Sequence, residues 1–399
     1  MVLRVFLDRF RDWRIRAGWK DWTRLALALV FFGYLLFLPV AGGAFSAQTH
    51  GRILDVTVLV VIYLVLALGL NIVVGYTGLL DLGYVAFVLI GAYTAALLMK
   101  QPWTDFGNSF LLIVLLSGLH CAVWGILRGA PTLHLAGDYY AIVTFAFAEI
   151  VFLFALNQGD ITGGAFGVKE YLSRHSLLGE SLRDTSRAYY YLLFVLFILC
   201  MICVHLLQRS RIGRAWLAIK ADETSAQTCG VSLRHYKLLA FALSGFIGGV
   251  GGALFSVKTI VVSPSNFDFW ISIVVLSCLV LGGIGSIRGA VLGTVILVSL
   301  GEVLREGFTL TEAPETVAFF RDHLAFLDQK IFEFRATEVL LKIPDQARYL
   351  VFGLVMVLIM VLRPQGLAPV SNKGRPLSPS DEIRIRASSP ALYRLRPPS

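Results

Sequence analysis

Long apolar blocks separated by short charged segments constrain this chain more than any other feature. A helix that crosses a bilayer needs about 20 predominantly apolar residues, and the blocks have that length or reach it with flanking residues. The sequence therefore predicts an all-α fold, a polytopic membrane helix bundle of about ten transmembrane helices. Only 15% of the residues are charged, which excludes a disordered chain, a coiled coil and an ordinary cytosolic enzyme. The blocks cover residues 25–40, 53–74, 79–99, 110–127, 138–157, 189–207, 238–257, 269–283, 289–304 and 348–362.

Basic residues indicate how the bundle is oriented. Seven lie in residues 1–24, six in residues 208–237 and seven after residue 362. Cytoplasmic segments of membrane proteins carry an excess of Lys and Arg, and ten spans place all three segments on one side. We therefore expect both termini in the cytoplasm, with 1–24 and 368–399 as basic tails around a transmembrane domain at 25–367.

The charge also indicates what the chain contacts. The net charge of +9 lies mostly in these segments, so it predicts contact with anionic membrane lipid and no nucleic acid. Block 25–40 has a second interpretation, because with Ala44–Ala47 it is similar to a signal peptide and its cleavage site. The charged segment before it is long for a signal peptide. A retained first span is therefore favoured, and cleavage stays open.

Glycine and polar residues interrupt the apolar pattern at two related places, 69–83 and 281–289. Membrane carriers place interrupted helices beside the translocation route, whereas a plain tight turn has a similar composition. Both interpretations stay open for the first place, and a turn is favoured for the second. Small residues four apart in 244–256 and at Gly289 and Gly293 predict faces where helices pack closely.

Glu149 lies within the apolar block 138–157. A carboxylate at that depth costs a few kcal/mol, so it should face the bundle interior, be protonated or have a partner. A structural role and a functional role are both open. A proton- or ion-coupled secondary carrier that uses Glu149 is therefore an alternative class of protein.

Residues 211–230 are too polar to span a membrane and too regular for a linker. Ala215, Trp216 and Ile219 recur at helical spacing among charges, and Gly230 is a plausible helix stop. We expect a short amphipathic helix, held at both ends by spans, that docks on a soluble partner and passes the partner's motion to the membrane helices.

The same segment carries a resemblance to a known family. Residues 223–230, Glu-Thr-Ser-Ala-Gln-Thr-Cys-Gly, resemble the ATPase-contacting loop of ABC importer permeases, with departures at Thr224 and Ser225 that keep the residues small. Further motifs, in the right order between about 53 and 367, resemble branched-chain amino acid permeases of the LivM type. They are Gly69–Gly78, Gly91–Tyr93, Gly137–Thr144, Thr162–Gly164, Arg211–Trp216, Gly282–Ser286 and Arg363–Leu367.

The resemblance implies a permease subunit of an importer for branched-chain or related amino acids in the inner (plasma) membrane. The implied partners are a second, LivH-type permease subunit, two cytoplasmic ABC ATPases and an external or periplasmic substrate-binding protein. The ATPase-coupling candidates are Arg211, Gly213, Arg214, Trp216, Asp222, Glu223 and Gly230. The translocation-route candidates are Asn71, Gly75, Thr77, Gly78, Asp81, Thr144, Glu149, Gly163 and Gly164.

We expect no enzymatic activity, no metal and no cofactor in this chain. The sequence has no Gly-Lys dipeptide and so no P-loop lysine, which assigns ATP to the partner ATPases. Cys200 and Cys203 form a C-x-x-C motif, but no second pair and no histidine cluster accompanies them. We interpret them as small buried apolar residues.

Residues 305–347 form an external insertion of about forty residues where the family usually has a short connection. Apolar side chains at helical spacing between Phe320 and Phe334 predict an amphipathic helix on the outer surface. Lipid or the binding protein would contact it. External loops lie near the point where substrate enters, so the insertion leaves the identity of the substrate undecided. An importer of urea or short amides is the close alternative.

Overall fold

The computed structural model describes residues 47–100, 109–133, 135, 137–169, 176–177, 180–181, 187–259, 261–306, 353–354, 357–358, 361 and 366–368. The predicted first span, both tails and nearly all of the insertion lie outside the described residues. So does most of the predicted last span.

Helices make up almost all of the described chain. The long helices are α3 (Ala47–Leu70), α4 (Val85–Met99), α5 (Ser109–Thr132), α6 (Asp138–Asn157), α8 (Arg187–Arg209), α11 (Leu233–Lys258), α12 (Phe269–Gly282) and α13 (Ile287–Glu306). A π-helix, η2 (Asn71–Thr77), continues α3 without a break. The short elements are α7 (Gly159–Thr162), η4 (Gly164–Phe166), α9 (Arg211–Ala221), α10 (Glu223–Thr228), η5 (Pro264–Asn266) and a hairpin of β1 (Ser176–Leu177) and β2 (Glu180–Ser181).

Among the described residues, six helical stretches are long and apolar enough to cross a membrane, judged by length and composition, and α4 is a shorter apolar helix. These stretches fall in six of the predicted blocks. The prediction of a helical membrane bundle is therefore confirmed at this coarser level, while the count of ten spans and the cytoplasmic termini stay predictions.

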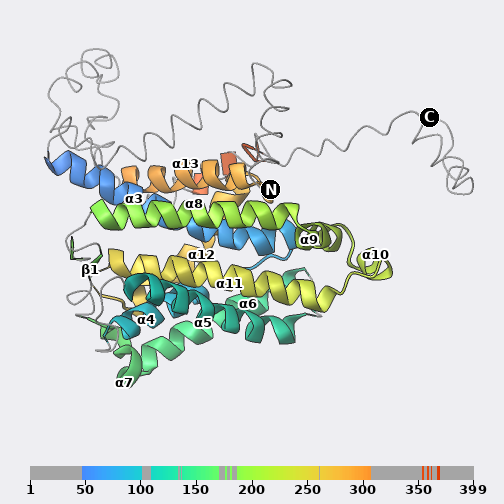
Figure 1. Cartoon of the computed structure of the whole chain (residues 1–399), viewed down its shortest axis with the longest axis horizontal. Coiled ribbons are helices and arrows are strands. Elements are labelled where there is room, and N and C mark those ends of the chain that lie inside the picture. The colour runs from blue at the N-terminus through green and yellow to red at the C-terminus, as the bar shows by residue number, and fades with distance from the viewer. Residues whose placement is uncertain are drawn as a thin grey trace, which may run out of the picture.

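The long helices lie side by side, with α9 and α10 at one end of the bundle and α7 and β1 at the other (Figure 1). Helix α11 is central and packs against α5, α4 and α3, and α3 also packs against α8 and α13. The predicted small-residue face of α11 makes these contacts possible. A Cβ atom at Gly252 would overlap the backbone carbonyl of Val88 on α4, so only glycine allows this approach.

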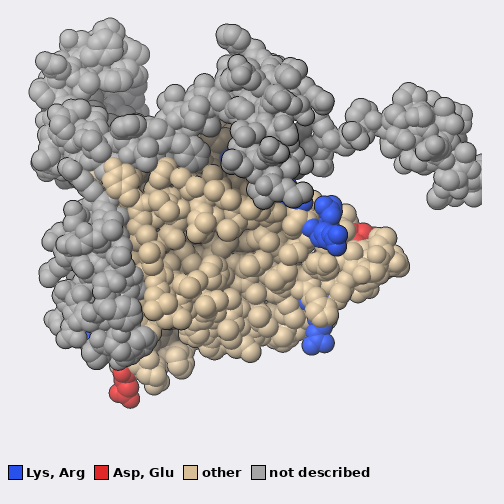
Figure 2. Space-filling model, viewed as in Figure 1, with Lys and Arg blue, Asp and Glu red and all other residues tan. Residues whose placement is uncertain are grey.

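The lateral surface of the bundle is apolar. Figure 2 shows an uncharged face, with Lys and Arg gathered at the α9 end. Exposed large side chains on this surface include Leu119 on α5, Phe154 on α6 and Leu206 on α8. Such continuous apolar exposure suits a bilayer or another membrane subunit and not water.

Several helix boundaries differ from the predicted blocks, and two of them flank Gly78. The block predicted to end at 74 continues to Thr77, and the block predicted to begin at 79 becomes helical only at Val85. The cause is Gly78, whose φ of 77° is left-handed and ends the helix. The other interruption is a tight turn at 283–286, which confirms the favoured interpretation of that segment.

Candidate coupling site

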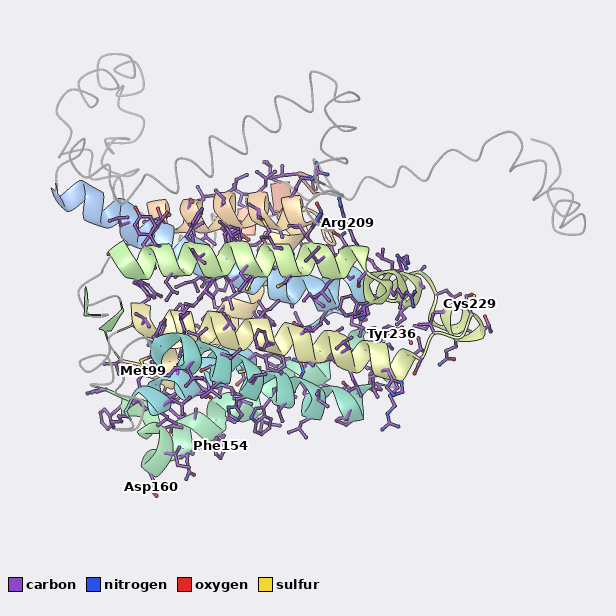
Figure 3. The ribbon with its side chains drawn as sticks, in the orientation of Figure 1. Met99, Phe154, Asp160, Arg209, Cys229 and Tyr236 are labelled. Carbon is purple, nitrogen blue, oxygen red and sulfur yellow. The ribbon has the colours of Figure 1, made fainter. Side chains whose placement is uncertain are left out.

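The segment predicted to contact a soluble partner folds as the two short helices α9 and α10 at one end of the bundle, near the labelled Arg209, Cys229 and Tyr236 in Figure 3. The Ser210 hydroxyl caps α9 by accepting hydrogen bonds from the backbone amides of Ile212 (3.1 Å) and Gly213 (3.4 Å). One face of α9 is buried and carries Gly213, Ala215, Trp216 and Ile219. The amphipathic helix predicted from the sequence is therefore present.

Trp216 anchors α9 to the membrane helices. Its side chain is fully buried, and the indole Nε1 donates a hydrogen bond to the backbone carbonyl of Tyr236, 2.8 Å away. Its ring stacks on Tyr76 of η2, with ring centroids 6.4 Å apart and planes 9° apart. Trp216 therefore faces its own bundle, and the surface that α9 offers to a partner contains Arg211, Arg214 and Leu217, which are exposed.

Helix α10 is held by two carboxylates. Asp222 accepts a hydrogen bond from the backbone amide of Ser225 at 3.0 Å and caps the helix. Hydrogen bonds from the amides of Ser225 and of the residue before it lower the pKa of Asp222 below its usual range. Glu223 pairs with Lys237 of α11 at 2.7 Å. Gly230 follows in a left-handed conformation, with φ 82°, and turns the chain toward α11.

Lys220 is a contact residue that the sequence reasoning missed. It lies in the last turn of α9, and its Nζ atom donates a hydrogen bond to the backbone carbonyl of Gly75, 2.8 Å away in η2. The last carbonyls of a helix lack partners within the helix, and a lysine can satisfy one of them. Partial burial lowers the pKa of Lys220. A basic residue at the end of an amphipathic helix was the available signal, but it carries no information about a partner 145 positions away.

The two glycine-rich interruptions, far apart in sequence, meet in space. Asn71 is fully buried, and its Oδ1 atom accepts a hydrogen bond from the backbone amide of Gly285 at 2.9 Å. A Cβ atom at Gly75 would overlap the Asn71 side chain and crowd the Gly285 backbone. These contacts join η2 to the turn between α12 and α13.

The segment 366–368 also joins this site. The backbone amides of Leu367 and Ala368 donate to the carbonyls of Leu281 and Gly282, at 2.9 and 2.8 Å. The end of α12 is thus paired with a segment near the C-terminus. Four regions of the chain therefore meet at the α9 end: η2, the α12–α13 turn, α9 and residues 366–368.

Asp81 and Arg128 form a buried, two-pronged ion pair beside this site. The two guanidinium nitrogens donate to the two carboxylate oxygens at 3.0 and 2.6 Å, and both side chains are at most 2% exposed. The guanidinium also lies 4.5 Å from the ring centre of Phe87. Asp81 and Arg128 therefore fix the loop between η2 and α4 to α5.

Thr144 of α6 holds the same loop. Its hydroxyl accepts a hydrogen bond from the backbone amide of Leu82 at 3.1 Å, and the side chain is fully buried. Thr77 is buried as well, and its hydroxyl donates to the carbonyl of Val73 in its own helix at 2.7 Å. In this conformation the side chains of Asp81, Thr77 and Thr144 are buried, and each forms hydrogen bonds within the protein.

The remaining route candidates lie elsewhere. Glu149 is half-buried on α6, and it has no hydrogen-bond or ion-pair partner within the described part of the chain. Gly163 and Gly164 lie next to α7, with φ angles of 74° and 56°, at the opposite end of the bundle. The structure therefore brings Asn71, Gly75, Thr77, Gly78, Asp81 and Thr144 together at the α9 end and separates Glu149, Gly163 and Gly164 from them.

The fold and this site are those of a helical membrane bundle with a structured contact segment at one end. The comparison with protein families agrees, because residues 52–360 match the family described as "Branched-chain amino acid transport system / permease component". This chain belongs to that family. No group of histidine, cysteine or acidic residues that could hold a metal occurs among the described residues.

Individual relatives are permeases by name. The chain is 33% identical over 360 residues to the high-affinity branched-chain amino acid transport system permease protein LivM of Escherichia coli (strain K12), covering 85% of this chain and 75% of that protein. It is 24% identical over 342 residues to a probable LivM of Methanocaldococcus jannaschii, covering 77% of this chain and 90% of that protein. It is also 25% identical over 273 residues to LivH of Escherichia coli (strain K12), covering 64% of this chain and 86% of that protein. No solved structure matches.

Proposed function

We propose that this chain is a permease subunit of an ABC importer that carries branched-chain amino acids across the inner membrane. Its family, and the names of its relatives in the LivM and LivH groups, support this assignment. The similarity to both groups also supports a pair of unlike permeases, in which a LivH-type chain is the second subunit.

In this proposal the α9 end faces the cytoplasm and contacts an ABC ATPase. The basic segments predicted to be cytoplasmic include 208–237, which contains both α9 and α10. Two partner ATPases bind and hydrolyse ATP, and this chain binds none. An external binding protein delivers the substrate at the α7 end, and the chain has about ten spans with both termini in the cytoplasm.

The observation that carries the coupling role is the position of α9. It presents Arg211, Arg214 and Leu217 outward, while Trp216 and Lys220 on the same short helix contact η2. A displacement of α9 by closing ATPases would therefore reach a membrane helix directly. For the cycle to be coupled, the docked binding protein and ATP must favour the same conformation of the helices.

Uptake of labelled leucine tests the proposal. A strain with the gene deleted should lose leucine uptake and regain it when the gene is restored. Excess isoleucine or valine should block the restored uptake, and excess urea should not. Leucine uptake that is unchanged by the deletion would refute the branched-chain assignment, and inhibition by urea would favour the amide-importing alternative.

A further inference from the structure

Two side-chain hydrogen bonds connect three separate parts of the chain through η2. The Lys220 ammonium binds the Gly75 carbonyl at 2.8 Å, and the Asn71 amide oxygen binds the Gly285 backbone N–H at 2.9 Å. Asn71 and Gly75 are one turn apart in η2, so α9 and the α12–α13 turn are tied to the same turn of helix. These contacts cross 145 and 214 positions of sequence.

From these contacts we propose that Lys220 and Asn71 are positioning residues that transmit movement of α9, through η2, to the turn between α12 and α13. The inference rests on the proposed function, because it assigns a path to the coupling between ATPase and membrane helices. It also reassigns Asn71 from a residue lining the route to a link between two helix ends.

The link between η2 and the α12–α13 turn is a close packing contact as well as a hydrogen bond. Gly75 and Gly285 are both buried, and a Cβ atom at Gly75 would lie 2.9 Å from the Gly285 Cα atom, too close for a real contact. Packed backbones transmit displacement because no flexible side chain lies between them to absorb it. A shift of η2 along its axis would therefore move the turn or break the Asn71 hydrogen bond.

The helix type makes η2 a good candidate for the part that changes shape. A π-helix is rare, occurs often at functional sites, and has longer-range hydrogen bonds than the α-helix it interrupts. Gly78 ends it in a left-handed conformation, so the segment has α3 on one side and a fixed stop on the other. Rewinding of η2 toward an α-helix would change both its length and the direction of its last carbonyls.

Asn71 carries a second sign of an alternative arrangement. Its Nδ2 atom is buried and has no hydrogen-bond partner within the described residues. A buried donor without an acceptor is unfavourable. Rewinding of η2 would change which backbone groups lie near this donor, and an arrangement that supplied an acceptor would be favoured by that hydrogen bond.

The link to α9 is weaker and can open. Lys220 is exposed over much of its side chain, and one ammonium–carbonyl hydrogen bond joins it to η2. Trp216 stacks on Tyr76 one turn earlier in α9, which keeps the helices adjacent when the Lys220 bond breaks. This arrangement lets α9 move with η2 over part of the cycle and separate from it over another part.

The test uses the assembled importer with both permeases, both ATPases and the binding protein, reconstituted in proteoliposomes. Lys220→Met removes the ammonium and keeps the length of the side chain, and Lys220→Arg keeps a cationic donor. Lys258→Met is the matched control, because it removes an ammonium that binds Asp55 at 2.6 Å at the opposite end of α11. Leucine uptake and ATP hydrolysis are measured on the same preparations.

We expect Lys220→Met to lower the leucine transported per ATP hydrolysed by about three- to tenfold, the range for loss of one charge-assisted hydrogen bond that is partly exposed to solvent. Lys220→Arg should recover most of that ratio, and Lys258→Met should leave it unchanged. A purely structural role would lower uptake and hydrolysis together. If the wild-type complex transports leucine and the Lys220→Met complex has the same ratio of leucine to ATP, this inference is overturned and the proposed function stands.

A double variant tests whether the two links form one path. If they act in series, Lys220→Met combined with Asn71→Leu should lower the ratio no further than the worse single variant. Effects that multiply would show two independent contributions and overturn the path. If the wild-type complex itself transports no leucine, the proposed function fails first.

Discussion

Removing one partner of the buried ion pair between Asp81 and Arg128 should destabilise the fold strongly, although the sequence suggested Asp81 as a route residue. Two unit charges about 4 Å apart attract by about 4 kcal/mol at the effective dielectric constant that suits protein sites. Removing one partner leaves the other charge buried without compensation, which costs about 3–5 kcal/mol. We therefore expect Asp81→Leu and Arg128→Met each to destabilise the protein by that amount.

Thermal unfolding of the detergent-purified chain measures this effect. A loss of 3–5 kcal/mol in a chain of 399 residues should lower the Tm by about 4–6 °C, because the unfolding entropy is about 2.1 cal/mol/K per residue. The double variant Asp81→Leu with Arg128→Met should unfold at a higher temperature than either single variant, because it leaves no unpaired buried charge. The exposed pair of Lys258 with Asp55 is the control, and Lys258→Met should cost no more than about 1 kcal/mol.

Two results would refute this reasoning. One is a wild-type Tm in both single variants, which would mean that the pair contributes little despite its burial. The other is loss of uptake in Asp81→Leu with normal stability and normal assembly. That outcome would return Asp81 to the translocation route, where the sequence pattern first suggested it.

Three further predictions follow from individual positions. Glu149→Ala should lower leucine uptake with membrane expression intact, because the carboxylate is half-buried in an apolar helix without a described partner; wild-type uptake would contradict this. Gly252→Ala should destabilise the protein by about 1–3 kcal/mol through overpacking and so lower the Tm. Gly301→Ala should leave the Tm unchanged, because a Cβ atom at Gly301 would meet no atom within 4 Å. Deletion of 308–344 should spare ATPase assembly but weaken stimulation by the binding protein, and unchanged, saturable dependence of uptake on that protein would contradict the role.

The local features of this fold were predictable from sequence. Continuous apolar blocks predicted the long helices, and the small residues of α11 predicted its close packing on α4. The spacing of Trp216 and Ile219 predicted the amphipathic helix α9 and its buried face. In each case the signal lies within a few turns of one helix, where periodicity determines which side is buried.

The links between helices were not predictable in the same way. Gly75 was singled out as an interruption, yet its carbonyl partner Lys220 and its neighbour Gly285 lie far along the chain. Arg128 directly follows the apolar block 110–127, and its burial against Asp81 depends on how α5 docks on the loop before α4. A single sequence specifies these pairs through the packing of the whole bundle, which no local pattern records.

The attachments of η2 and of the loop after it differ in strength, and this difference bears on which part moves. Asp81 and Arg128 hold the end near α4 with two buried, charge-assisted hydrogen bonds. Lys220 holds the end near η2 with one partly exposed bond. A force applied to α9 would therefore shift η2 through the contact at Gly75 before it displaced the end of the loop held at Asp81. Movement should then be carried by η2 and the α12–α13 turn, while α4 and α5 stay fixed relative to each other.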